Sequence, residues 1–135
     1  MDSKQLVRDI FEMINSGDLG RVRELIHEDY VDHGSPLGDM YGPQGFLALN
    51  QMFADAFSEA HSGIDMLIAE GDLAAWRVTL TGIHSGEFMG VPPTGRRVTF
   101  ETLNFGRIKD GKAIEHWAPM DVSSLMAQLG VSQAA

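Results

Sequence analysis

The sequence predicts an α+β fold, an antiparallel sheet with helices on one face. Two observations predict it. Apolar residues recur at helical spacing through much of the first 57 residues, whereas after Ser58 the chain forms strand-like runs bounded by Gly and Asp turns. Helices that come before the strands are typical of α+β proteins, because alternating β-α-β units would instead build a parallel sheet.

Two helices are expected at the start of the chain. Asp2 and Gln5 are arranged like a capping box, an apolar stripe follows, and Gly17 is a natural stop. Asp18 has the side chain of a helix cap and predicts a second, shorter helix immediately afterwards.

A third helix is expected to begin at Gly42-Pro43, because proline is favoured in the first turn of a helix. Its apolar stripe includes Phe53. Residues 27–41 contain two glycines and a proline and are followed by Gly42, so they are predicted to be irregular.

Four strands are expected after the third helix, at residues 64–69, 73–84, 97–108 and 113–118. Successive side chains of a strand point to opposite faces, so Trp76 and His84 share the apolar face of the second one. By the same rule, His116 and Ala118 fall on one face of the last strand. A short helix at 121–129 is expected to close the chain.

Length and composition limit what the protein can be. The 135 residues are expected to form one domain, 1–135. No apolar run approaches the roughly 20 residues needed to cross a bilayer, so no membrane partner is expected. The N-terminus lacks the charged head and apolar run of a signal peptide, which makes a cytoplasmic location the expectation.

Cysteine content and charge exclude several functions. The chain contains no cysteine, which rules out disulfides, Cys-ligated zinc, iron–sulfur clusters and thiol nucleophiles. A formal net charge of −9, with basic residues scattered except for Arg96-Arg97, argues against nucleic acid. The expected partner is a small, neutral or weakly polar molecule, or a second copy of the chain.

The most informative stretch lies near the C-terminus, where His116 and Asp121 stand five positions apart around Pro119. Proline ends a strand, so Asp121 opens the next element, where its carboxylate can point into a cavity. His84 also lies on an apolar face, and the two histidines beside a carboxylate predict a polar cluster at the mouth of an apolar pocket. Two structural alternatives stay open: Asp121 as a helix cap and His116 as a satisfied core histidine.

The remaining candidate residues have plainer roles. His33 lies in a predicted loop and is a candidate for the pocket rim, while Trp76 and Trp117 are expected in the core or pocket wall. Asp32 and the histidines show neither the paired-histidine helix motif nor the close spacing of metal ligands, so no metal site is expected.

A family resemblance covers nearly the whole chain. Residues 82–97 (GIHSGEFMGVPPTGRR), 107–112 (RIKDGK) and 116–130 (HWAPMDVSSLMAQLG) resemble the SnoaL-like polyketide cyclases, as do Asp29-Tyr30 and the helix start at Gly42-Pro43. The resemblance implies the NTF2-like fold, a cone made of a curved, mainly antiparallel sheet and three N-terminal helices around an apolar pocket. It also implies a homodimer that forms through the sheet face.

The same resemblance implies an activity, the intramolecular aldol closure of a polyketide ester without metal or organic cofactor. Asp121 matches the family's general base, and His116 or His84 would hold it or donate a hydrogen bond to the oxyanion. Tyr30 and Phe53 are expected in the ligand-binding wall with His84.

Other functions stay open at this point, because one fold serves many activities. The enzymatic rivals are a proton shuttle like that of ketosteroid isomerase and a hydrolase acting on an apolar ring. The non-enzymatic rival is a carrier or sensor of an apolar ligand. Whether Asp121 and His116 converge in a closed pocket separates base catalysis from the other possibilities.

Overall fold

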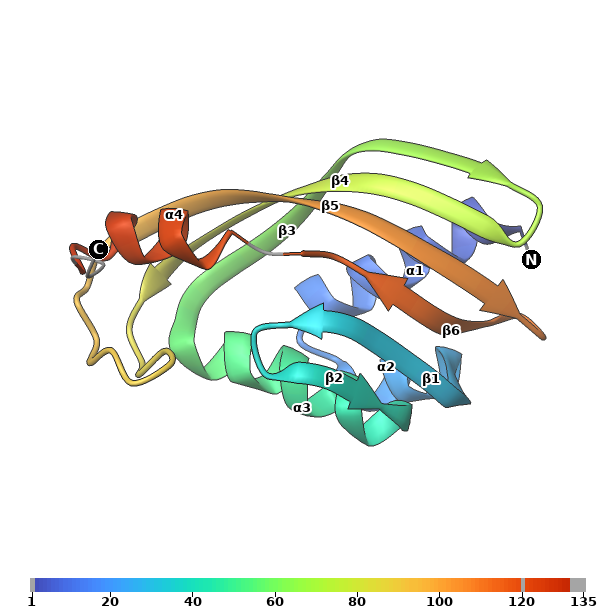
Figure 1. The fold of residues 1–135 in the computed structure, drawn as a ribbon, viewed down its shortest axis with the longest axis horizontal. Coiled ribbons are helices and arrows are strands. Elements are labelled where there is room, and N and C mark those ends of the chain that lie inside the picture. Colours follow the sequence, from blue (N-terminus) through green and yellow to red (C-terminus); the bar gives the residue numbers. More distant parts are fainter. Residues whose placement is uncertain (1, 120, 132–135) are drawn as a thin grey trace.

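The computed structural model describes residues 2–119 and 121–131, which form one curved six-stranded sheet with helices against it (Figure 1). In chain order, the elements are α1 (Ser3–Asn15), α2 (Leu19–Val22), a 3₁₀ turn (Arg23–Leu25), β1 (Ile26–Ser35), β2 (Gly38–Tyr41), α3 (Gly42–Ala56), β3 (Phe57–Glu70), β4 (Leu73–His84), β5 (Arg97–Lys109), β6 (Lys112–Trp117) and α4 (Val122–Gln128).

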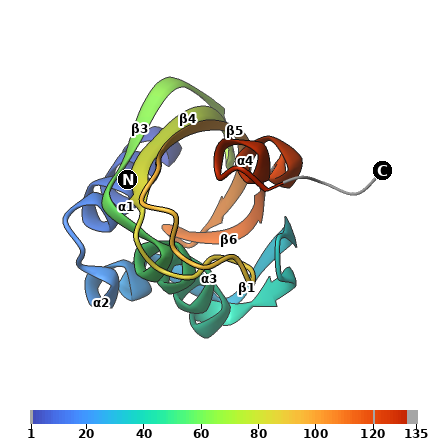
Figure 2. The ribbon, with the colours of Figure 1, turned by 90° about the vertical axis from the view of Figure 1, so that its left-hand side faces the viewer.

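The sheet has the strand order β2-β1-β6-β5-β4-β3 and is mixed. Every neighbouring pair is antiparallel except β1 and β6, which run parallel. Seen end-on, the strands follow an arc, with α1 and α3 lying at its open side (Figure 2). The prediction of an α+β fold with a mainly antiparallel sheet is therefore confirmed.

Local signals set the ends of the early helices. The Oδ1 atom of Asp2 accepts a hydrogen bond from the Gln5 amide at 2.7 Å, and Asp18 caps α2 through the Arg21 amide at 3.2 Å. Between these helices, Gly17 turns the chain with a φ of 80°, a conformation that other residues rarely adopt. The predicted caps of Asp2 and Asp18 and the predicted stop are present, but the Gln5 side chain bonds Asp9 instead of completing the capping box.

Most strand boundaries agree with the alternation of the sequence. β4 spans the predicted residues, while β5 and β6 agree within a residue at each end. β3 begins at Phe57, seven residues before its predicted start. Its register with β4 is interrupted twice, between Ser58 and His61 and between Ile64 and Met66. Such irregularities break the two-residue period, which hides the first half of the strand from pattern analysis.

The prediction of irregular structure at 27–41 is wrong, because this segment forms β1 and β2. In β1 only Ile26, Tyr30 and Asp32 are buried, so the strand lacks a regular apolar face. Its backbone is instead paired on both edges, with β2 on one side and β6 on the other. The helices are consequently two before β1, one after β2 and a fourth near the C-terminus, rather than three that all precede the strands.

The apolar core holds the helices against the concave face of the sheet. Leu6 of α1 packs with Val22 and Ile26 in one cluster, and each of them is at most 1% exposed. Burying a side chain of this size contributes about 1.5–3 kcal/mol. At the other end of the sheet, Leu125 of α4 is fully buried against Val98 and its neighbours. None of the helices in the described parts of the chain is long and apolar enough to cross a membrane.

Candidate active site

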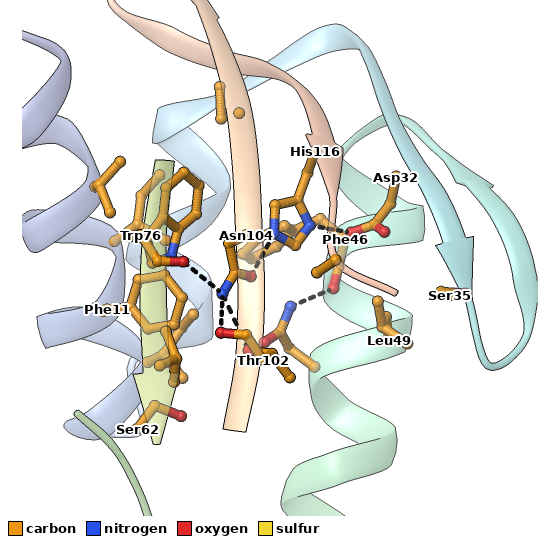
Figure 3. A pocket seen from close by; sticks show the side chains of 18 of the residues that line it. Phe11, Asp32, Ser35, Phe46, Leu49, Ser62, Trp76, Thr102, Asn104 and His116 are labelled. Atoms are coloured by element: carbon orange, nitrogen blue, oxygen red, sulfur yellow. Dashed lines mark hydrogen bonds and ion pairs between the residues drawn. The ribbon is translucent and has the colours of Figure 1, made fainter. Parts of the chain in front are cut away.

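An apolar cavity of about 160 Å³ lies between the concave face of the sheet, α1 and α3 (Figure 3). Its apolar wall includes Leu6, Val7, Ile10, Phe11, Phe46, Leu49, Phe53, Val78, Leu80 and Phe100. Polar and charged side chains also line the cavity, among them Asp32, Thr102, Asn104, Arg107, Glu115 and His116. A mostly apolar cavity with a few convergent polar groups is the usual form of a small-molecule site.

A second cavity, of about 210 Å³, adjoins the first on the side where α1 ends. Five residues line both cavities: Ile14, Asn50, Phe53, Ser62 and Leu80. Ligand pockets typically measure about 300–1,000 Å³, which neither cavity reaches alone. Only together do the two cavities fall within this range.

The polar centre of the first cavity is a pair formed by Asp32 and His116. These residues are register partners on the parallel strands β1 and β6, and both side chains point inward. Asp32 Oδ2 lies 2.9 Å from His116 Nδ1, and only 4% of Asp32 is exposed. A buried carboxylate is costly unless it is paired and hydrogen-bonded, and His116 supplies that partner.

Tyr30, two residues before Asp32, points to the same side of β1 and donates its hydroxyl to Asp32 Oδ2 at 2.8 Å. Burial raises the pKa of Tyr30 well above its ordinary value, and the negative charge of Asp32 and the hydrogen bond to it act in the same direction. Tyr30 therefore stays a neutral phenol that donates to the carboxylate.

Asn104 of β5 completes the cluster on the other side of the imidazole. Its Oδ1 atom lies 2.8 Å from His116 Nε2. Its Nδ2 atom donates to the Thr102 carbonyl at 3.1 Å, the Thr102 hydroxyl at 3.0 Å and the Trp76 carbonyl at 3.4 Å. The chain from Asp32 through His116 to Asn104 thus joins three strands across the sheet (Figure 3).

The indole of Trp76 holds the imidazole from one face. The two rings are nearly parallel, with their centroids 5.7 Å apart and an angle of 23° between them. Gly106, the register partner of His116, makes room for this arrangement, because a Cβ there would lie 2.9 Å from the Trp76 ring. A side chain at position 106 would displace the indole that supports His116.

The cavity contains four of the residues expected at the site: Tyr30, Phe53, Trp76 and His116. Asp121 lies elsewhere. Its side chain is exposed, and its Oδ1 atom caps α4 by accepting a hydrogen bond from the Ser124 amide at 3.0 Å. The structure therefore brings Asp32, rather than Asp121, to His116, and it places Asp121 in the alternative role of a helix cap.

His84 and His116 are not brought together either. Trp76, which stacks on His116, precedes His84 by eight residues of β4, a separation of about 26 Å along a strand. His84 is fully buried outside the cavity lining, where it packs on Phe57 and accepts a hydrogen bond from the Thr94 amide at 3.2 Å. Its role in this structure is to hold the chain segment that follows β4.

His33 and Trp117 lie outside the residues that line the two cavities. Their rings stack at 4.9 Å, and His33 Nε2 lies 3.0 Å from Glu115 Oε2. Among the residues that the structure describes, no group of three His, Asp or Glu side chains is arranged to hold a metal ion.

Neither Asp32 nor Asn104 was predicted to have a catalytic role. A signal for Asp32 was present in its spacing of two from Tyr30, which places both on one face of a strand. It went unused because the segment was interpreted as a loop. Asn104 had the corresponding signal, since it follows Thr102 by two within a predicted strand.

This fold and site define a class of protein. A curved sheet closed by helices around an apolar cavity, with a buried acid–base pair on the wall, is an NTF2-like α+β cone of the ligand-binding or catalytic type. Comparison with known proteins specifies the class further. Residues 4–129 match the SnoaL-like polyketide cyclase family, and the chain belongs to this family.

Individual relatives agree with this assignment. The chain is 34% identical to an aklanonic acid methyl ester cyclase of Streptomyces peucetius, over 93% of this chain and 88% of that one. It is also 34% identical to the nogalonic acid methyl ester cyclase of Streptomyces nogalater, over 86% and 88% of the two chains. Among solved structures, IdmH of Streptomyces antibioticus, described as a candidate polyketide cyclase, matches with 37% identity and a TM-score of 0.80, over 94% and 97%.

Proposed function

We propose that this protein closes a ring in a polyketide ester by an intramolecular aldol condensation, with the buried Asp32–His116 pair as its base. The observation that carries the proposal is the 2.9 Å contact between these side chains inside an apolar cavity. The ester substrate class is supported by the relatives, two of which are named methyl ester cyclases.

The chemistry needs only a proton transfer and one new carbon–carbon bond. The pair removes a proton from a carbon between two carbonyl groups, and the electron pair of the broken C–H bond remains as an enolate. The enolate carbon attacks a ketone or aldehyde carbonyl of the same molecule. The alkoxide that forms takes the proton back from the pair, so the product is an isomer of the substrate.

Thr102 is the best-placed group to stabilise the negative oxygen that develops. Its hydroxyl oxygen accepts a hydrogen bond from Asn104 Nδ2, and within the described parts of the chain no acceptor takes its proton. Thr102 lines the cavity, so this proton can be donated to a ligand oxygen. A donor placed in this way is often worth about 3 kcal/mol in the transition state.

The test compares two matched variants, Asp32→Asn and Asp121→Asn, on an aromatic polyketide methyl ester that carries a β-keto group. We expect Asp32→Asn to lower kcat by about 10²–10⁴-fold, the usual contribution of a general base, while Asp121→Asn keeps wild-type turnover within a few-fold. Product is identified as the ring-closed isomer by mass and NMR.

The reverse pattern, with Asp121→Asn inactive and Asp32→Asn active, would assign the base to Asp121, as the family resemblance predicts. A wild-type protein that binds the ester without converting it would instead make this family member a carrier of apolar ligands. Equal turnover by the wild type, Asp32→Asn and Asp121→Asn would refute both base assignments.

We also propose that a second copy of the chain covers the outer face of the sheet. Four exposed apolar side chains of β3 and β5 support this: Met66, Ile68, Leu103 and Phe105. All four pair with Ala75 or Arg77 of β4, whose side chains point away from the cavity, so they form one patch. Light scattering should give a dimer that Leu103→Glu dissociates.

The cytoplasmic location stays a prediction.

A further inference from the structure

We infer that Asn104 keeps a proton on Nε2 of His116, so that the proton acceptor of the pair is the Oδ1 atom of Asp32 rather than the imidazole. The proton on Nε2 is assigned from the hydrogen-bond network alone. The assignment of Asp32 Oδ1 as the acceptor rests on the proposed function, because it names the atom that receives the substrate proton.

The neighbours of the Asn104 amide fix its orientation. One end of the amide lies 3.1 Å from the Thr102 carbonyl oxygen and 3.4 Å from that of Trp76. Carbonyl oxygens only accept hydrogen bonds, so this end must be the NH₂ group. Rotating the amide would place its oxygen against two carbonyl oxygens, which have no proton to donate to it. Asn104 Oδ1 consequently faces His116.

The orientation of Asn104 in turn places a proton on Nε2 of His116. Asn104 Oδ1 can only accept, and it lies 2.8 Å from His116 Nε2, so Nε2 must donate. His116 Nδ1 shares one further proton with Asp32 Oδ2. Whether that proton sits on the nitrogen or on the oxygen, Nε2 stays protonated. In a Ser-His-Asp triad the aspartate also binds Nδ1, but there Nε2 is the free base, whereas here Asn104 holds Nε2.

One oxygen of the Asp32 carboxylate keeps a lone pair available for a proton. Asp32 Oδ2 already accepts from Tyr30 and faces His116 Nδ1. Within the described parts of the chain, no hydrogen bond reaches the second oxygen, Oδ1, and Asp32 lines the cavity. Oδ1 is therefore the carboxylate atom free to take a proton from a ligand. The proton moves from the substrate carbon to Oδ1, and later from Oδ1 to the product alkoxide.

The network also makes Asn104 a positioning residue, which acts on the proposed reaction through His116. Trp76 covers one face of the imidazole, while Asn104 and Asp32 bind its two nitrogens. The ring therefore cannot turn Nε2 toward the cavity without losing both hydrogen bonds. Replacing Asn104 should change the tautomer of His116, an effect that a purely structural residue would not have.

The test is ¹⁵N NMR of histidine-labelled protein at neutral pH, with the His116 signals identified by their loss in His116→Gln. We expect wild-type Nε2 to resonate as a proton-bearing nitrogen. Asn104→Leu has a similar shape but no acceptor, so Nε2 should shift to the frequency of an unprotonated nitrogen. Asn104→Asp keeps an oxygen acceptor and should retain the wild-type frequency.

An unprotonated Nε2 in the wild type overturns the inference, as does the same Nε2 frequency in the leucine and aspartate variants. The wild-type spectrum alone decides the matter if Asn104→Leu does not fold. A protein with a protonated Nε2 that forms no ring-closed product would refute the proposed function and leave the proton assignment standing.

The atom that receives the proton is tested by the exchange of the acidic hydrogen of a cyclic β-keto ester into D₂O. Asp32→Asn should lower the exchange rate at least about 100-fold, in line with the loss of a general base. His116→Gln keeps the Asp32 carboxylate and a donor beside it, and should retain more exchange than Asp32→Asn. Exchange that is lost to the same extent in both variants would overturn the assignment to Oδ1.

Discussion

Asp32 and His116 are register partners on parallel strands, and their side chains meet at 2.9 Å although they are 84 residues apart in sequence. The contact depends on the parallel pairing of β1 with β6, which sets Asp32 opposite His116. Because both strands send these side chains to the concave face, a carboxylate and an imidazole meet in a mostly apolar cavity. The candidate chemistry of this protein follows from that single strand pairing.

The capping role of Asp121 predicts a loss of stability without a matching loss of activity. Asp121→Ala removes the acceptor of the Ser124 amide and should lower the free energy of unfolding by about 1 kcal/mol. Asp2→Ala, at the start of α1, is the matched control because its carboxylate makes the same kind of cap. Urea titration measures both. An unchanged midpoint for Asp121→Ala would show that its cap contributes nothing.

The buried phenol of Tyr30 predicts a loss of stability at alkaline pH. Its folded-state pKa is raised well above the ordinary value of 10.0, so above that pH the unfolded chain loses the proton while the folded chain keeps it. The stabilisation is complete below pH 10 and decreases as the pH rises further.

This prediction is measured in Tyr41→Phe, where Tyr30 is the only tyrosine. Phenolate absorbance should appear together with the loss of the far-ultraviolet circular dichroism of the fold. Phenolate formation near pH 10 in protein that is still folded would contradict the burial of Tyr30.

Occupation of the cavity should be visible in tryptophan fluorescence. The chain has two tryptophans, and only Trp76 lines the cavity. In Trp117→Phe, an aromatic keto ester should quench or shift the emission of Trp76 with saturable dependence on concentration. The reciprocal variant, Trp76→Phe, leaves only Trp117, which lies outside the cavity lining, and should respond weakly. Equal responses would place the ligand elsewhere.

The close approach of Gly106 to Trp76 predicts a site that tolerates no side chain there. Gly106→Ala would put a Cβ 2.9 Å from the indole, and overpacking of this kind typically costs about 1–3 kcal/mol. Turnover should fall as well, because Trp76 supports His116. Gly63→Ala, another strand glycine whose nearest contact is 3.6 Å, is the control. Similar losses in both variants would rule out this specific contact.

Several parts of the structure could be predicted because their causes are local. The carboxylates of Asp2 and Asp18 cap helices a few residues away, and Pro43 marks the start of α3. In β4, strict alternation placed Trp76 and His84 on one apolar face, and both are buried. These features depend on neighbours within a few positions, so a single sequence contains the information.

Pairing between distant strands decided the rest. β1 has too few apolar residues to be recognised as a strand by its pattern, and its inward carboxylate is tolerated only because His116 and Tyr30 bind it. The sequence alone determined that a histidine and a carboxylate were available near the end of the chain. Only the tertiary structure decided which carboxylate lies beside the histidine. Asp121 accepts a hydrogen bond from the Ser124 amide of α4, whereas Asp32 faces the imidazole across β1 and β6.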